Sequence, residues 1–529
     1  MTGESAMPRF RPLDSGRLLT ALRGAILLLA AGAVLMIVRL PWIGDMGVHA
    51  ATVERLRHDL VHPGNPMVDS PTDSPYYSPW TVCLALFAKA TGLDTFDVLR
   101  CAAVVGLLLL AFGVRQFVRT LSPHPAAPPL AVLCLLLLWG VKPFIWSGFL
   151  GLTSLSANAS YPSTFATGLG FLLLALLTHA LRRPDTGFAA YAGLGALWAV
   201  LTLSHQFTGV VFTFGALGVL VTARAGSARV LLPRLAAALA VGLAILAVWP
   251  YYSFFALLGA GGLEEIHQPL YQHTLVRFGL VPLGVLALAL RLRRDRRDPL
   301  VVWFALGLVT VAAGAALDKW SLGRTEPAVV MPAQIAAALC VLESGARRFR
   351  AAFAAVLTAA LAVGLWAQRD AVTFVVREDA LPAAVTAGAW KVWEPPAWTT
   401  RYTAYGDVVL TGDQGAAITL PAYGGYTVGT GYPDFFLPDE DRRDADTERY
   451  FAPGTPREER LAVLRRYDVR WVLQRPSRGG LPAGDPALRE AGRGPDGRVL
   501  YEVVDEVVGQ ATGQAPGRAG AAGAVSGPR

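Results

Sequence analysis

The chain has 529 residues, of which 53% are hydrophobic and only 16% are charged, and its mean hydropathy is +0.42. Soluble globular proteins carry about 25% charged residues, so this composition excludes an ordinary soluble protein and indicates a membrane protein. The formal net charge of +8 would suit nucleic-acid binding. The arginines, however, stand in short clusters between apolar runs, as at cytoplasmic loop ends, so nucleic acid is excluded as a partner.

Eleven apolar segments are long enough to cross a hydrocarbon core of about 30 Å. In chain order they are residues 18–40, 97–118, 129–149, 162–181, 187–204, 206–222, 235–252, 274–291, 299–317, 325–342 and 350–367. If the N-terminal arginines are cytoplasmic, the later arginine clusters fall on the same side. The sequence therefore predicts an α-helical polytopic membrane protein with a cytoplasmic N-terminus. The odd number of spans makes residues 368–529 extracytoplasmic.

The first outer loop, residues 41–96, is the longest loop between spans. It is predicted to carry two amphipathic helices, 45–60 and 79–91, joined by a segment too rich in proline to be helical. We assign it to a membrane domain that covers residues 1–367.

The polar C-terminal region predicts a small mixed α/β domain, residues 368–508. Strand-like runs, "DVVLTG", "AAITLPAY", "VRWVLQ" and "RVLYEVV", alternate with one helix, "PREERLAVLRRY". The last residues, 509–529, are a low-complexity run of Gly, Ala and Pro that predicts a disordered tail.

Ionisable side chains avoid the middles of the spans and gather at their outer ends, beginning with Asp45 and His49. On a helix that starts near Gly44, the i, i+4 spacing places these two side chains on one face. Asp45 is interpreted as an N-cap that accepts backbone N–H groups or as a catalytic base, and the two roles can coexist. We assign His49 to substrate binding rather than to a metal.

Four more residues of the first outer loop are candidate binding residues. Asp69 and Asp73 lie in "VDSPTDSPYYSP" and could bind a divalent cation or a sugar hydroxyl, although turn formation alone explains aspartate before Ser-Pro. Tyr76 and Tyr77 could stack on a sugar ring or belong to the interfacial aromatic belt. The requirement for a metal stays open, and no other cofactor is indicated.

Two later outer loops supply further candidates. His205 ends one span in "LTLSHQFTG" and could bind substrate or cap the turn between two spans. Glu264 and Glu265, with His267, form either a second acidic cluster or a solvated loop face.

Lys319 and Arg324 are the strongest basic candidates on the outer face. The planar guanidinium of Arg324 could clamp a lipid phosphate, and the alternative is snorkelling to bulk lipid headgroups. The Walker A motif, the dinucleotide fingerprint, G-x-S-x-G and H-E-x-x-H are all missing from the sequence, so the enzyme classes that they mark lose their usual signatures.

The layout of residues 18–475 resembles the bacterial members of the GT-C glycosyltransferase superfamily. The resemblance rests on "GDMGVHAATVERLRHDLVHPGNP" and "SPYYSPWTVCLALFAKATGL", and on "VVLTGDQGAAITLPAYGGYTVG" followed by "PREERLAVLRRYDVRWVLQ". The resemblance implies an inverting enzyme on the outer face of the bacterial plasma membrane. Such an enzyme transfers a sugar from a polyprenyl-phosphate donor to a cell-envelope glycan, lipid or protein.

The resemblance also implies that the acid after the first span, here Asp45, is catalytic. Many members show two acids there, whereas Asp45 stands between Gly44 and Met46. Two alternatives stay open: a lipid or polysaccharide transporter, for which broken spans and an internal repeat are expected, and a catalytically inactive relative that acts as an assembly partner.

Overall fold

The computed structural model describes residues 15–223, 228–259 and 264–504. The predicted disordered tail, 509–529, lies outside the described residues. The chain divides into two compact units. Unit 1 consists of Met1–Met46 and Tyr77–Val392, and unit 2 consists of Gly47–Tyr76 and Trp393–Arg529.

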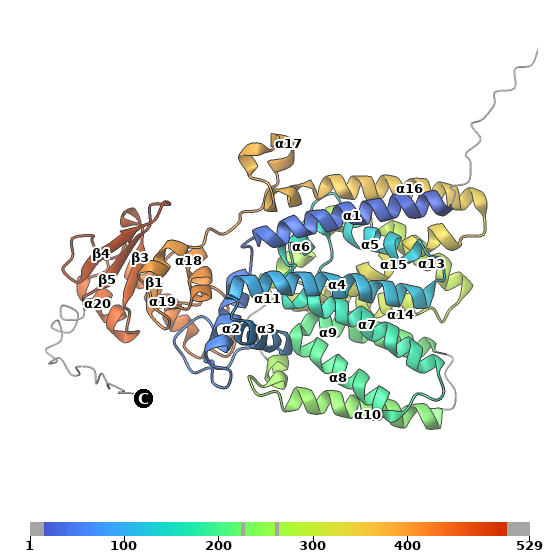
Figure 1. Ribbon diagram of the computed structural model, residues 1–529, viewed down its shortest axis with the longest axis horizontal. Helices are drawn as coiled ribbons and strands as arrows, with labels where there is room; N and C mark the ends of the chain where they lie inside the picture. The colour runs from blue at the N-terminus through green and yellow to red at the C-terminus, as the bar shows by residue number, and fades with distance from the viewer. Residues whose placement is uncertain (1–14, 224–227, 260–263, 505–529) are drawn as a thin grey trace, which may run out of the picture. The chain divides into compact units, whose positions relative to one another are not determined.

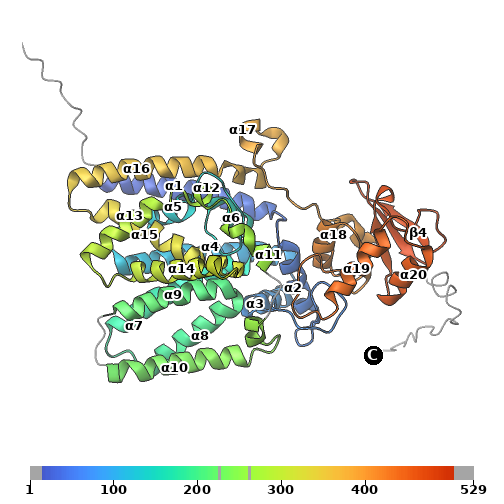
Figure 2. The same ribbon diagram turned by 180° about the vertical axis from the view of Figure 1, so that it is seen from behind.

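Unit 1 is a bundle of α-helices (Figure 1), seen from behind in Figure 2. Its longer helices are α1 (Ser15–Arg39), α3 (Pro79–Thr91), α4 (Thr95–Leu121), α5 (Ala127–Leu137), α7 (Pro162–Arg182), α8 (Phe188–Ser204), α9 (Gln206–Thr222), α10 (Ala228–Ala247), α13 (Pro282–Arg294), α14 (Pro299–Ala316), α15 (Pro327–Glu343) and α16 (Arg347–Ala367). Short helices lie in its connections: α6 (Leu152–Ala157), η1 (Phe254–Gly259), α11 (Glu264–His267), η2 (Gln268–Tyr271), α12 (Thr274–Phe278), η3 (Trp320–Thr325), η4 (Arg369–Phe374), η5 (Glu378–Ala380) and α17 (Ala383–Thr386).

Seven helical segments in the described part of the chain are long and apolar enough to cross a membrane. They are Gly16–Arg39, Thr95–Leu121, Pro162–Arg182, Ala228–Ala247, Pro299–Ala316, Trp320–Glu343 and Arg347–Ala367. Three shorter helices, α5, α8 and α9, are also apolar. The protein is thus a multi-pass membrane protein, as predicted. Each of the eleven predicted segments overlaps a helix, but a count of eleven spans is not shown.

Helices α4 and α7 pack closely because each presents a glycine at their crossing. A Cβ atom on Gly113 would lie 2.3 Å from the carbonyl oxygen of Gly168, and one on Gly168 would lie 2.6 Å from the amide nitrogen of Leu110. In lipid, helices associate through close packing rather than through the hydrophobic effect, so small residues at the crossing matter most.

Unit 1 has two chemically different ends. At the arginine end, Arg182 donates to the carbonyl of Thr120 at 2.9 Å and Arg234 donates to that of Pro184 at 3.1 Å. The opposite end, which we call the loop end, carries the segments 138–161, 248–259, 264–281 and 317–326, which consist of loops and short helices. Most of the polar candidates of unit 1 lie in these segments.

The predicted span 129–149 is interrupted partway. Helix α5 has 11 residues, so it rises about 16 Å, roughly half of the hydrocarbon thickness. The amide of Gln368 donates to the carbonyl of Leu136, and that of Gln334 donates to the carbonyl of Leu138, both at 2.9 Å. These side chains satisfy carbonyls at the helix end, which permits irregular backbone at this depth.

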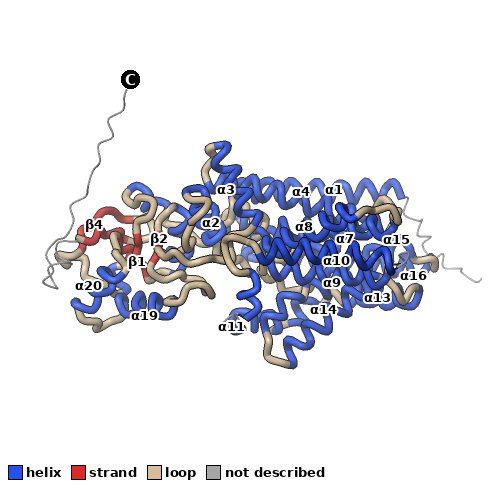
Figure 3. Tube along the Cα trace, turned by 90° about the horizontal axis from the view of Figure 1, so that it is seen from below, coloured by secondary structure: helices blue, strands red, loops and turns tan. Residues whose placement is uncertain are grey.

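Unit 2 contains the β-strands of the described chain (Figure 3). They form one sheet in the order β2 (Tyr426–Thr427), β1 (Val408–Thr411), β3 (Trp471–Gln474), β5 (Val499–Val503), β4 (Leu488–Arg493). Strand β1 is parallel to β2 and β3, whereas β5 is antiparallel to β3 and β4. Its helices are α2 (Met46–His58, whose first residue belongs to unit 1), η6 (Ala397–Arg401), α18 (Gln414–Thr419), η7 (Leu420–Tyr423), α19 (Glu440–Phe451), α20 (Arg457–Arg466) and η8 (Pro476–Arg478). The mixed α/β prediction is confirmed.

The strand predicted at "AAITLPAY" is wrong, because this run forms α18 and η7. Asp413 caps α18 by accepting the backbone N–H of Ala416 at 3.0 Å. A capped start favours helix over strand for the residues that follow. Ala416 and Leu420 still reach the core, where they pack with Val409 and Trp471 of the sheet.

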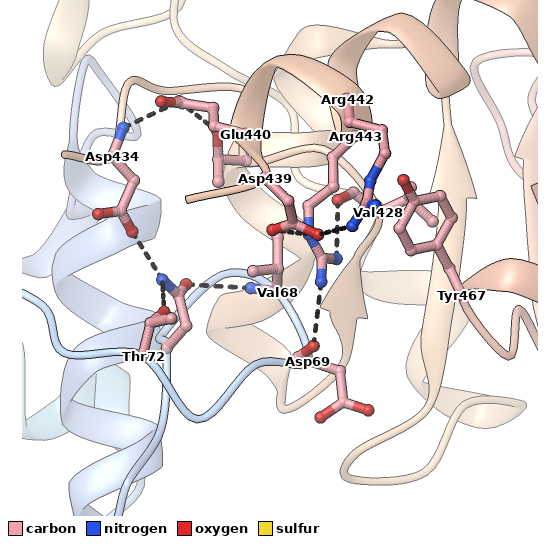
Figure 4. A network of polar contacts seen from close by, with 12 residues as sticks. Val68, Asp69, Thr72, Val428, Asp434, Asp439, Glu440, Arg442, Arg443 and Tyr467 are labelled. Carbon is pink, nitrogen blue, oxygen red and sulfur yellow. Dashed lines mark hydrogen bonds and ion pairs between the residues drawn. The ribbon is translucent and has the colours of Figure 1, made fainter. Parts of the chain in front are cut away.

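The proline-rich part of the first loop is built into unit 2. Thr427 of β2 donates its backbone N–H to the carbonyl of Met67 at 2.9 Å, and Val68 forms a parallel bridge with Thr427. Asn65 donates to the carboxylate of Asp434 at 2.6 Å. Arg443 reaches the carbonyl of Asp69 (Figure 4).

Candidate active site

The candidate residues fall into both units. Unit 1 holds Asp45, Tyr77, His205, Glu264, Glu265, Lys319 and Arg324, and unit 2 holds His49, Asp69, Asp73 and Tyr76. We describe the two groups separately, beginning with unit 2.

His49 lies in the core of unit 2. Only 7% of its surface is exposed, and its ring meets that of Tyr76 edge-on at 5.4 Å. Burial lowers the pKa of His49 to about 3, because a low-dielectric environment disfavours the charged ring. Tyr76 in turn packs against Tyr432 at 6.0 Å. Both residues therefore serve to attach the first loop to unit 2.

Asp69 and Asp73 are exposed. Asp69 takes part in the polar network of unit 2 through its backbone carbonyl, while its carboxylate points away from that network (Figure 4). In the described ranges, no group of three or more His, Cys, Asp or Glu side chains is placed to hold a metal ion. Since these donors do not fit a divalent cation, we derive no step through a metal.

Arg324 is the centre of the candidate site in unit 1. It lies in η3, directly before α15, and only 8% of its surface is exposed. Its guanidinium carbon is 4.6 Å from the ring centre of Phe207 and 5.6 Å from that of Trp146. Aromatic faces exclude water from the cation, which strengthens its attraction for an anion.

His205 connects α8 to α9 beside Arg324. Its Nε2 is 3.4 Å from Nη2 of Arg324 and 3.2 Å from Oγ of Ser147. Its Nδ1 accepts the backbone N–H of Thr208 at 3.2 Å, which caps the N-terminus of α9. An accepting Nδ1 places the proton of the neutral ring on Nε2. In this tautomer Nε2 donates to Oγ of Ser147, and its approach to Nη2 of Arg324 is a contact between two donors rather than a hydrogen bond.

The segment that supplies Ser147 depends on a glycine. Gly148 has a φ of +88°, and a Cβ atom there would lie 3.2 Å from Oγ1 of Thr208 and 3.3 Å from Cε1 of His205. Only glycine adopts this conformation without strain at such close range. Ser154 steadies the same segment by donating to the carbonyl of Trp146 at 2.6 Å and accepting its N–H at 3.0 Å.

His267 completes the aromatic surround. It is 4% exposed, and its ring centre is 5.6 Å from that of Phe207 and 5.8 Å from that of Trp146. Helix α11, which carries His267, also carries Glu264, so the loop 264–271 is held against η3 and the Arg324 region.

Glu264 supports this arrangement from the side. Its carboxylate accepts the backbone N–H of Ser321 at 2.8 Å and the hydroxyl of Ser321 at 2.9 Å. Burial by itself raises the pKa of Glu264, but the bonds from Ser321 and the charges of Lys319 and His267 outweigh it, so the net pKa is lowered. Glu264 thereby binds the start of η3. Glu265 and Lys319 are exposed.

Asp45 occupies a half-buried turn at the loop end of unit 1. The carbonyl of Ile43, two residues earlier, accepts the hydroxyl of Tyr161. Ile43 packs with Ala157 and Phe374, so this turn is anchored by the segment that also carries Ser147 and Ser154. Tyr77 is buried, packs against Tyr251 at 5.6 Å, and accepts the indole N–H of Trp249 on its carbonyl at 2.9 Å.

The structure thus brings together Arg324 and His205 from the predicted set and adds Ser147, Trp146 and Phe207, which sequence analysis did not select. The Nε2 atom of His205 lies 3.2 Å from the hydroxyl of Ser147 and 3.4 Å from the guanidinium of Arg324. Such a set of donors can bind a phosphate oxygen and stabilise negative charge on it.

No family model matches the chain, and no curated protein sequence is detectably similar to it. Its fold, however, matches solved structures. One is the cryo-EM structure of the arabinofuranosyltransferase AftD from Mycobacteria, with a TM-score of 0.56, 16% identity and 93% of this chain covered. The match spans only 40% of the AftD chain.

A second match is ArnT from Cupriavidus metallidurans, whose crystal structure was determined with bound undecaprenyl phosphate. Its TM-score is 0.51 at 16% identity, covering 90% of this chain and 98% of ArnT. At this identity the matches establish the fold alone. They confirm that the chain has a GT-C glycosyltransferase fold, as the sequence resemblance predicts.

Proposed function

We propose that the protein is an inverting glycosyltransferase that uses a polyprenyl-phosphate sugar as donor. The acceptor is a glycan, lipid or protein of the cell envelope. The main support is the buried side chain of Arg324, which packs against Trp146 and Phe207. The imidazole of His205 lies beside Arg324, and the hydroxyl of Ser147 lies beside His205. The GT-C fold and the undecaprenyl phosphate bound to ArnT support this reading.

In the proposed reaction, an acceptor hydroxyl attacks the anomeric carbon of the donor sugar as the bond from that carbon to the phosphate oxygen breaks. Asp45 takes the hydroxyl proton as general base. Arg324 and His205 stabilise the negative charge that develops on the departing lipid phosphate. A single displacement inverts the anomeric centre, so one carboxylate is enough and no covalent intermediate forms.

We place this chemistry on the extracytoplasmic side of a bacterial plasma membrane. The arginine end of unit 1 suits the cytoplasmic side, where short loops are rich in Lys and Arg. The loop end, with Asp45 and Arg324, then faces outward together with the exported unit 2.

Transfer of a labelled sugar by the purified full-length protein tests the proposal. We would supply undecaprenyl-phosphoryl glucose, mannose or arabinofuranose together with an envelope fraction, and follow both the product and the released lipid phosphate. Arg324→Lys keeps the charge but loses the planar fork, so turnover should fall about tenfold or more.

Arg369→Lys is the matched control, because Arg369 also stacks on a tryptophan, Trp366, at 4.7 Å and is not part of the site. Equal loss in the two variants, or no transfer with any donor, would contradict the proposal.

A further inference from the structure

Glu326 is a buried carboxylate that the proposed reaction leaves without a role. It is 5% exposed and occupies the N-cap position of α15, yet its side chain makes no capping hydrogen bond. Its Oε2 has no hydrogen-bond partner within the described part of the chain. A buried carboxylate oxygen without a donor is costly, so its retention points to a group that binds there.

Arg277 is the cation whose charge acts on Glu326. Arg277 donates from Nη1 to the carbonyl of Pro269 at 2.5 Å and lies over the ring of Phe144, while its buried Nε has no partner among the described residues. An acceptor and a donor are therefore both unused.

A neutral hydroxyl group suits this pair better than an ion does. It can donate its proton to the carboxylate of Glu326 and accept the N–H of Arg277 through its oxygen. A phosphate would be repelled by Glu326, and an amine would be repelled by Arg277. The pair therefore selects for an uncharged, hydroxyl-bearing ligand.

The position of Glu326 indicates which hydroxyl it binds. Arg324 and Glu326 are separated only by Thr325, so their Cα atoms lie within about 7.6 Å of each other. In a lipid-phosphate sugar, the ring hydroxyls lie a few bonds from the phosphate. A phosphate bound at Arg324 would therefore hold its sugar close to the segment that carries Glu326.

We propose that Glu326 and Arg277 form the sugar-recognition subsite for the donor, in which Glu326 accepts a hydrogen bond from a ring hydroxyl. This inference rests on the proposed function, because it takes the ligand at Arg324 to be a lipid-linked phosphate. The two subsites divide recognition between them. Arg324 binds the phosphate of any polyprenyl phosphate, and Glu326 distinguishes the sugar-bearing donor from the spent lipid.

Binding of two probes separates these roles. The affinity of the full-length protein in nanodiscs would be measured for undecaprenyl phosphate and for its glucosyl, mannosyl and arabinofuranosyl forms. Wild-type protein should prefer at least one sugar form over the bare lipid phosphate by about tenfold or more. Glu326→Gln preserves the shape but removes the charge. It should abolish most of that preference without weakening the binding of undecaprenyl phosphate.

Glu343→Gln at the other end of α15 is the control, because Glu343 pairs with Arg291 at 3.3 Å, and it should change neither affinity. Arg277→Gln should reduce the same preference, which provides a second variant if Glu326→Gln is unstable. Equal binding of all four lipids by wild-type protein, or full preference retained in both variants, would overturn the subsite. Failure of wild-type protein to bind undecaprenyl phosphate, or unchanged binding in Arg324→Gln, would instead refute the proposed phosphate site.

Discussion

Replacing Arg55 by Met should loosen unit 2, because this side chain holds the first loop to the C-terminal sheet. Arg55 is fully buried in α2. Its guanidinium donates to the carbonyls of Gly424 and Gly425, the former at 2.9 Å, and lies 3.6 Å from the ring centre of Tyr426. Methionine fills a similar volume but makes none of these bonds.

The expected cost follows from those contacts. A hydrogen bond from a charged donor contributes about 1.5–3 kcal/mol, and a cation–π contact contributes about 0.5–2 kcal/mol. The carbonyl of Gly424 also accepts the N–H of Gly406 at 2.9 Å, so it stays bonded in the variant. We therefore expect a loss of about 3–5 kcal/mol from the lost hydrogen bonds and cation–π contact.

Hydrogen exchange of the full-length protein, read by mass spectrometry, measures this loss locally. The amides of α2 and β1 should exchange about 10²- to 10³-fold faster in Arg55→Met, since each 1.4 kcal/mol is a factor of ten. Arg57→Met is the matched control: Arg57 is partly exposed and pairs with Glu54 at 3.3 Å, a contact worth about 0–1 kcal/mol. Equal acceleration in the two variants, or none in β1, would refute the role of Arg55.

Three further predictions concern the cores of the two units. His49, whose pKa burial lowers to about 3, stays neutral in the folded state while the unfolded chain takes up a proton below about pH 6.5. Unit 2 should therefore lose about 2 kcal/mol of stability between pH 7 and pH 5. Hydrogen exchange at the two pH values should show that this loss is smaller in His49→Gln than in wild-type protein. The loss should not be smaller in the control His58→Gln, because His58 is exposed. Asn65 accepts the N–H groups of Met67 and Val68 and donates to Thr72 and Asp434. Asn65→Ala should therefore lower the stability of unit 2 by about 2–4 kcal/mol. Preserved resistance of the 60–76 segment to protease would count against this estimate. Gly113→Ala places a Cβ atom 2.3 Å from the carbonyl oxygen of Gly168. It should destabilise unit 1 by about 1–3 kcal/mol and so lower the midpoint of thermal unfolding. Gly193→Ala is the control, because a Cβ atom there meets nothing within 4 Å, and it should leave the midpoint unchanged or higher.

Sequence patterning predicts the helices of the first loop well, because their cues are local. The predicted helix 79–91 matches α3, which begins with a capping box at Ser78 and Pro79 and ends at Gly92 in the left-handed conformation. Three of the four predicted strands match β1, β3 and β5. Apolar alternation and capping residues lie within a few positions of each other in the sequence, so these elements need no tertiary information.

Features set by distant partners could not be predicted from local patterns. Helix α5 ends at Leu137 because Gln334 and Gln368, about 200 residues later, satisfy the carbonyls at its end. In the sequence, only Gly140, Pro143 and Gly148 indicate that the apolar run 129–149 is irregular. Residues 47–76 likewise read as part of a membrane-domain loop, since their partners in unit 2 lie some 370 positions further on.

The candidate site was predicted in part for the same reason. Arg324 and His205 stand out as polar residues at span ends, and the structure places them 3.4 Å apart. Ser147 was missed because it lies within an apolar run. Glu326 was missed because an acid beside a proline at a helix start resembles an ordinary cap, and only its burial without a capping bond distinguishes it.

Single-turnover transfer by wild-type protein and by Asp45→Asn tests the central claim most directly. With the preferred lipid-phosphate sugar bound, the proposed mechanism predicts that Asp45→Asn retains donor affinity within about threefold but loses about 10²-fold or more in the rate of sugar transfer, because the base is missing while the phosphate site is intact. The wild-type product should have the anomeric configuration opposite to that of the donor. Equal rates in the two proteins, or retention of configuration, would contradict a single displacement assisted by Asp45.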